Sequence, residues 1–177
     1  MKRLFILGLL ASFLAWNISA RADDDSLKEV EKHIKTLKTS KLKSERLSAV
    51  SDLLLLSTVA NNSVGAAVGV LTDVFKNEKD EQIRATAARV LHNSGAEAKE
   101  VIPICIAILE DDKLDGDLKT ATAQLVLACW QSKEAQQALP ILKKIERAEI
   151  AKDEPNRNDH LLEAVRGAID ALMKGNK

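Results

Sequence analysis

Apolar residues recur with helical spacing along the chain from Ser26 onward. In the first such stretch, Leu27, Val30, Ile34 and Leu37 fall on one helix face, and lysines occupy positions between them. No stretch shows the sustained alternation of apolar and polar residues that is typical of strands. The pattern predicts an all-α protein with helices over residues 26–38, 43–60, 63–76, 79–94, 98–110, 116–131, 134–150 and 159–174.

A short motif recurs in the second helix of successive pairs. It combines a basic residue, two small or apolar residues and a larger apolar residue, and it begins at Arg46, Arg84 and Lys119. The first helices repeat as well, since Val101–Ile104 aligns with Ala138–Ile141. A helical pair cannot bury its apolar face alone, so repeated pairs stack on one another. We therefore expect about four antiparallel helical hairpins, with an irregular helical bundle as the alternative.

Residues 79–112 resemble the junction between two HEAT repeats, and the likeness weakens toward both ends of the chain. It is carried by the Ile83-Arg84 pair, the small residues Ala87 and Ala88, the turn at Gly95, and Pro103. The last unit departs from the pattern because residues 151–158 lengthen its loop. The resemblance implies a compact, right-handed α-solenoid of the HEAT (armadillo-type) class, in which the second helices line a concave surface. It also implies a scaffold, adaptor or peptide-binding function.

The first 22 residues have the form of a signal peptide. Lys2 and Arg3 precede the apolar run Leu4–Trp16, and Ala20-Arg21-Ala22 has the small-x-small form that a signal peptidase recognises. We therefore divide the chain into a signal peptide, residues 1–22, and a HEAT-like helical repeat domain, residues 23–177. This predicts a periplasmic or secreted protein with no stable transmembrane segment after cleavage. An uncleaved N-terminal anchor is the alternative.

The formal net charge of the whole chain is zero, so charge alone excludes few classes of binding partner. Cleavage after Ala22 would leave 23 basic residues against 26 acidic ones. This mildly negative balance argues against nucleic acid as the main partner. The first hairpin is nevertheless basic, so binding of an anionic envelope surface through this hairpin is one alternative function.

The residues that usually carry chemistry do not gather in the sequence. His33, His92 and His160 belong to three different repeats, without a carboxylate or cysteine at ligand spacing. Cys105 and Cys129 lie in apolar surroundings, and the predicted hairpin places them too far apart for a disulfide. We therefore expect two free, buried thiols, no metal, no cofactor and no enzymatic activity.

The acidic segment that begins at Asp111 resembles a calcium loop at first sight. An EF-hand loop needs an oxygen ligand at its third position and glutamate at its twelfth. Those positions hold Lys113 and Thr122. We therefore interpret the segment as a solvated turn followed by acids at the start of the next helix.

Four residues form the predicted partner-binding surface. Arg89 and Gln124 occupy equivalent positions in successive second helices, and Thr86 and Asn93 share the helix face of Arg89. Ordinary solvent exposure of this face is the alternative. The sequence thus predicts an exported, non-catalytic scaffold or adaptor that binds a protein or peptide partner. A relative of the HEAT-like lyases is a further, weaker alternative that the resemblance allows.

Overall fold

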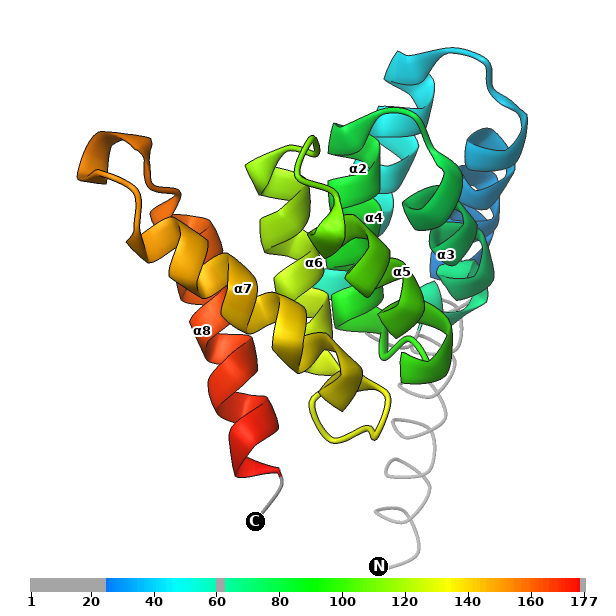
Figure 1. The fold of residues 1–177 in the computed structure, drawn as a ribbon. Coiled ribbons are helices and arrows are strands. Elements are labelled where there is room, and N and C mark those ends of the chain that lie inside the picture. The colour runs from blue at the N-terminus through cyan, green and yellow to red at the C-terminus, as the bar shows by residue number, and fades with distance from the viewer. Residues whose placement is uncertain (1–24, 60–62, 176–177) are drawn as a thin grey trace, which may run out of the picture.

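The computed structural model describes residues 25–59 and 63–175, and these ranges contain helices and no strand (Figure 1). The all-α prediction is confirmed, whereas the predicted signal peptide lies outside the described residues. The α-helices are residues 25–39, α2 (Lys43–Val59), α3 (Val68–Asn77), α4 (Glu81–Ser94), α5 (Ala98–Glu110), α6 (Gly116–Ala128), α7 (Leu139–Ile150) and α8 (Asp159–Lys174). Short 3-10 helices are η1 (Ser63–Ala67), η2 (Ala135–Ala138) and η3 (Glu154–Asn156).

Most predicted helix boundaries agree closely with the structure, and the exceptions have local causes. The predicted helix 116–131 ends at Ala128, because its last turn tightens around the backbone N–H of Cys129. The predicted helices 63–76 and 134–150 begin as the 3-10 helices η1 and η2. The α-helical part is therefore shorter than the apolar periodicity suggests at these places.

Local chemistry sets several helix ends. The side chain of Asp80 accepts a hydrogen bond from the backbone N–H of Ile83 at 3.1 Å and so caps the start of α4. Gly95 ends α4 with a φ of 66°, a left-handed conformation that glycine adopts without steric cost. Pro140 lies in the first turn of α7, where its missing N–H leaves no helical hydrogen bond unmade.

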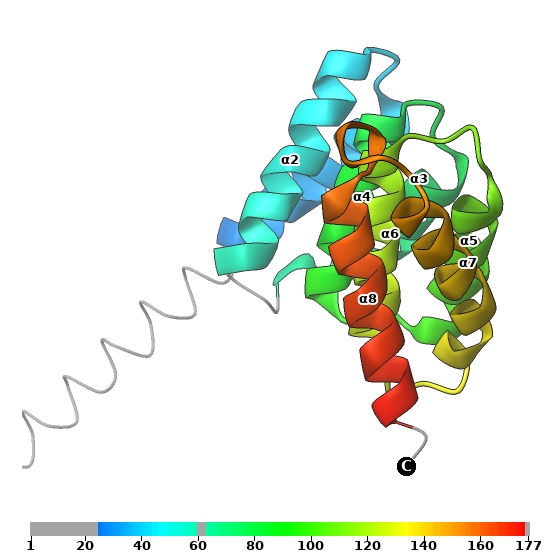
Figure 2. The same cartoon turned by 60° about the vertical axis from the view of Figure 1, so that its left-hand side comes forward.

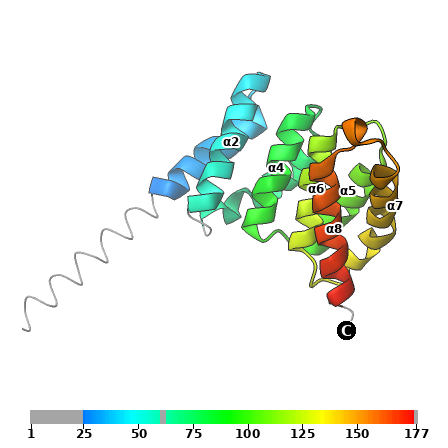
Figure 3. The same ribbon diagram turned by 90° about the vertical axis from the view of Figure 1, so that its left-hand side faces the viewer.

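The helices form two layers. In one layer α2, α4, α6 and α8 contact one another in that order, and in the other α3, α5 and α7 do the same. Across the layers α3 packs on α4, α5 on α6, and α7 on α8. Figures 2 and 3 show this arrangement, with the helix of residues 25–39 beside α2 at the end opposite α8. Successive antiparallel hairpins packed side by side produce this order.

The core between the layers is mainly aliphatic. Small residues are buried where α4 and α6 meet their neighbours, among them Ala87, Ala88, Ala121 and Ala123. Larger leucines, isoleucines and valines fill the rest, and Phe75 is the largest fully buried side chain. Small side chains at these contacts allow the helices to approach closely.

The basic residues that open the repeated motif share a structural role. Each has an acidic residue near it at the end of the next helix in the other layer: Glu78 for Arg46, Asp111 for Arg84, and Glu149 for Lys119. Arg84 also has Glu81 of its own helix nearby. Hydrogen bonds of 2.8 and 3.2 Å join the guanidinium and carboxylate groups of the first pair. In the other pairs the charges lie near each other without a hydrogen bond. The repeat therefore places opposite charges between neighbouring hairpins.

Ala87→Leu should lower the midpoint of thermal unfolding. Ala87 is completely buried on α4, which packs against α2, α3 and α6, so a larger side chain must push helices apart. Overpacking of this kind costs about 1–3 kcal/mol. Circular dichroism during heating measures the shift.

Arg89→Ala is the control, because the ion pair of Arg89 with Asp117 is partly exposed and such pairs contribute about 0–1 kcal/mol. A silent Ala87→Leu beside a strongly destabilising Arg89→Ala would contradict the orientation of α4.

Candidate functional site

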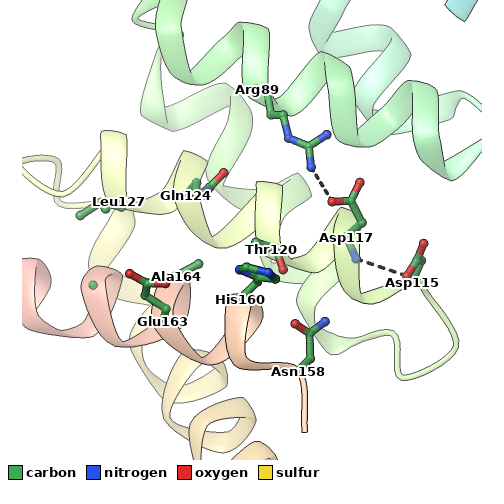
Figure 4. Close-up of a pocket in the computed structure, with 11 residues that line it drawn as sticks. Arg89, Asp115, Asp117, Thr120, Gln124, Leu127, Asn158, His160, Glu163 and Ala164 are labelled. Carbon is green, nitrogen blue, oxygen red and sulfur yellow. Dashed lines mark hydrogen bonds and ion pairs between the residues drawn. The ribbon is translucent and has the colours of Figure 1, made fainter. Parts of the chain in front are cut away.

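A hollow of about 760 Å³ lies mainly between α6 and α8 (Figure 4). We call it the groove. Its polar lining comes from three helices of one layer and from the residues that cap two of them: Arg89 of α4, Asp117, Thr120 and Gln124 of α6, His160 and Glu163 of α8, and the caps Asp115 and Asn158. The groove thus combines residues from three successive hairpins.

The end of the groove beside Asn158 depends on a close approach between the starts of α6 and α8. Gly116 is the first residue of α6, and a Cβ atom there would overlap Nδ2 of Asn158. A larger residue at position 116 would therefore require the side-chain amide of Asn158 to move. Asn158 in turn caps α8, since its Oδ1 accepts a hydrogen bond from the backbone N–H of Leu161 at 3.0 Å.

Glu149 fixes the loop that leads into α8. Only 6% of this residue is exposed, and its carboxylate accepts hydrogen bonds from Nζ of Lys152 at 2.6 Å and from the backbone N–H of Asn158 at 3.0 Å. Burial raises the pKa of Glu149, but these hydrogen bonds and the charges of Lys152 and Lys119 outweigh it. The pKa therefore lies below its usual value. The carboxylate is ionised at neutral pH and holds Asn158 at the edge of the groove.

Arg89 and Asp117 form an ion pair across the junction of α4 and α6, drawn as a dashed line in Figure 4. The backbone N–H of Asp117 also donates to the carboxylate of Asp115 at 3.2 Å, which caps α6. Two of the three carboxylates in the groove are therefore engaged with protein groups. Each retains acceptor capacity, because a carboxylate has about four lone-pair sites.

Other polar groups of the groove have no partner among the described residues. They are the side-chain amide of Gln124, the imidazole of His160 and the carboxylate of Glu163. An amide both donates and accepts hydrogen bonds, and an ionised carboxylate accepts them and attracts cations. The groove therefore offers unsatisfied groups of both kinds to a bound molecule.

The structure brings together two of the four predicted binding residues, Arg89 and Gln124. Thr86 is 7% exposed, and its hydroxyl donates to the backbone carbonyl of Gln82 at 2.8 Å. Its predicted position on the exposed face is wrong, because the packing of α4 against its neighbours turns this residue inward. Asn93 is half-buried and donates to the hydroxyl of Ser57 at 2.9 Å, which joins α4 to α2. Thr86 and Asn93 therefore do not line the groove.

Sequence reasoning missed the contribution of α8. His160, Glu163 and Gly167 line the groove and follow the spacing of one helix face. That spacing was available in the sequence. However, the last unit departs from the repeat at the long loop of residues 151–158, so alignment of the repeats did not extend the predicted surface to α8.

A second hollow, of about 580 Å³, lies on the other layer between α3 and α5. Its wall is more apolar and includes Pro103, Ile104 and Ala107. Arg84 reaches its edge, but its Nε donates to the backbone carbonyl of Phe75 at 2.9 Å. Asp73, Lys76 and Glu100 also line this hollow, and their side chains have no hydrogen-bond or ion-pair partner among the described residues. These three groups come from α3 and α5 alone, whereas the groove gathers residues from three helices.

The remaining candidate residues lie apart from the groove. His33 is buried beside α2, with its ring nitrogens 3.7 Å from a carboxylate oxygen of Asp52 and 3.9 Å from one of Glu29. His92 lies in the last turn of α4, and its Nδ1 is 3.0 Å from the backbone carbonyl oxygen of Gln124. In the described ranges no group of three or more histidine, cysteine, aspartate or glutamate residues is arranged to hold a metal ion.

The two cysteines are free thiols, as predicted. Cys105 is fully buried, whereas Cys129 is half-buried at the end of α6, so the prediction of two buried residues is correct only for the first. Burial raises the pKa of both thiols, and the neighbouring Cys129 adds to the effect at Cys105. Neither thiol is therefore activated as a nucleophile.

Among the described helices, none has the length and apolar character needed to cross a membrane. Comparison with protein families, with curated proteins and with solved structures finds no match to this chain. The resemblance to HEAT repeats thus rests on the motif around Arg84 and on its recurrence along the chain.

Proposed function

We propose that this chain is an exported, non-catalytic scaffold of HEAT type that binds a protein or peptide partner in the groove. The observation that carries the proposal is the gathering of unpartnered polar groups in a hollow built by three successive hairpins. A right-handed solenoid, with α2, α4, α6 and α8 on its concave side, would present the groove to an elongated partner. Stacked helical repeats use such continuous surfaces for binding.

The charge of the groove favours a partner segment with a basic side chain. Asp115, Asp117 and Glu163 supply three carboxylates, and Arg89 supplies one guanidinium group that is already paired. The amide of Gln124 matches a polar side chain or the backbone of an extended peptide. A lysine or arginine near Glu163, with neighbouring backbone near Gln124, would satisfy both groups.

Glu163→Lys should reduce recovery of the partner by about tenfold or more, because the new lysine would repel the basic side chain of the partner. The tagged protein is recovered from its own envelope fraction after mild cross-linking, and bound proteins are quantified by mass spectrometry.

The intact mass of the same preparation locates its N-terminus. A product that retains Leu4–Trp16 would contradict cleavage after Ala22.

The matched control is Glu110→Lys, which makes the same charge change at an exposed position on α5, in the other layer. It should leave recovery of the partner unchanged. Equal losses in the two variants would indicate an effect of net charge. Recovery that survives Glu163→Lys would place the binding surface outside the groove.

A further inference from the structure

The first helix and the turn that follows it are rich in lysine. Residues 32–44 contain five lysines and neither aspartate nor glutamate. Lys32, Lys35, Lys38 and Lys41 are exposed, and we call these four residues the lysine surface. Glu29 and Glu31 precede these lysines and Glu45 follows them, but residues 26–50 still hold seven basic residues against three acidic ones, a net charge of +4.

Neighbouring basic residues are already neutralised, but the lysine surface is not. Lys43 forms an ion pair with Asp80, and Arg46 forms one with Glu78. The four residues of the lysine surface form no ion pair or hydrogen bond through their side chains among the described residues. The fold therefore uses the basic residues at the start of α2 for its own packing and leaves the preceding lysines available.

Two residues of the lysine surface, Lys32 and Lys35, face away from the rest of the molecule. Val30, His33 and Leu37 form the buried side of the first helix, and Lys32 and Lys35 lie on its opposite side. Figure 3 shows this helix at the end of the molecule, beside α2 and away from α8. A flat partner could therefore meet these lysines without contacting the groove.

Exposed leucines flank the lysines. Leu42, directly after Lys41, is 59% exposed, and Leu27, near the start of the first helix, is 44% exposed. Basic residues beside exposed apolar side chains are typical of surfaces that bind membrane interfaces. The lysines attract anionic headgroups, and the leucines gain free energy by entering the boundary between headgroups and acyl chains.

We infer that the lysine surface docks the protein on an anionic lipid bilayer, with Leu42 inserted at the interface. Each lysine near such a surface strengthens binding about fivefold, so four together give a substantial, salt-sensitive association. The groove lies toward the other end of the molecule and remains accessible to its partner. This inference is independent of the proposed function, because each surface has its own variants.

Flotation with lipid vesicles tests the inference, using the chain of residues 23–177. The protein should bind vesicles in which about a third of the lipid is phosphatidylglycerol and should not bind vesicles of phosphatidylcholine alone. Lys32→Gln, Lys35→Gln and Lys38→Gln together should weaken binding about 100-fold. Higher salt should weaken binding of the wild-type protein, because exposed charges are screened.

The matched control combines Lys113→Gln, Lys133→Gln and Lys144→Gln, which remove the same charge from other elements. It should bind the anionic vesicles like wild type, and an equal loss in the two triple variants would overturn the inference. Leu42→Ser should weaken vesicle binding several-fold but not binding to soluble heparin. If Leu42→Ser has no effect and heparin binds as tightly as the vesicles, the surface recognises polyanions in general and the bilayer assignment fails.

Discussion

Phe75→Ala should lower the free energy of unfolding by about 3–5 kcal/mol, as for other large aromatic residues removed from a core. Phe75 is completely buried near the end of α3. Its loss combines the transfer free energy of the ring with the cost of the cavity that remains. The backbone carbonyl of Phe75 accepts a hydrogen bond from Arg84, so α3 and α4 are held together here and cannot easily close the cavity. Urea unfolding followed by circular dichroism measures the change.

Two controls make this prediction specific. Phe75→Leu keeps much of the buried volume and should cost about 1–2 kcal/mol, well below the alanine variant. Leu55→Ala removes an apolar side chain that is 64% exposed and should change stability little. If Phe75→Ala were no more destabilising than Leu55→Ala, the described packing of α3 would be wrong.

The helices were predictable because their apolar residues follow the helical period closely. The start of α4 and its end at Gly95 follow from local capping chemistry that the sequence displays directly. The end of α6 was harder to predict, since Cys129 and Trp130 continue the apolar pattern without continuing the helix. The turn geometry around Cys129 decides that boundary, and apolar periodicity alone does not predict it.

The repeat in the sequence partly indicated which helices share a layer. The motif beginning at Arg46, Arg84 and Lys119 marks equivalent helices, and these helices do share one layer. The acidic residues opposite them were not anticipated, because they occupy different positions relative to each helix end. Charge complementarity between hairpins becomes evident only when both layers are placed.

The groove was only half predictable. Arg89 and Gln124 follow from the repeat register, but Thr86 illustrates how one helical turn divides exposed from buried positions. A shift of three residues on a tightly packed helix is enough to move a side chain into the core. The contribution of α8 depends on a loop whose length breaks the register, so Glu163 could not be aligned with its counterparts.

Glu78→Gln should lower the free energy of unfolding by about 2 kcal/mol at neutral pH, because it leaves the guanidinium of Arg46 without its counter-charge and weakens its charged hydrogen bonds. The side chains of Arg46 and Glu78 are only 19% and 12% exposed, and two hydrogen bonds join them. The carboxylate also accepts hydrogen bonds from the backbone N–H groups of Lys79 and Asp80, at 2.8 and 3.2 Å. This one residue therefore ties the start of α2 to the turn between α3 and α4.

The effect of Glu78→Gln should also depend on pH. Burial raises the pKa of Glu78, but the hydrogen bond from Arg46, those from the backbone of Asp80 and Lys79, and the charge of Arg46 outweigh it. The pKa therefore lies below its ordinary value of 4.5. A carboxyl group with a lowered pKa stabilises the folded state fully above its unfolded pKa and loses this contribution as pH falls through the folded pKa. The stability difference between wild type and Glu78→Gln should thus be constant near neutral pH and shrink below about pH 4.5.

Unfolding curves across this pH range measure the difference. Glu97→Gln, which disrupts an exposed pair with Lys99, should show almost no difference from wild type at any pH. A Glu78→Gln difference that stays constant into the acid range would show that the ionised carboxylate does not provide the stabilisation.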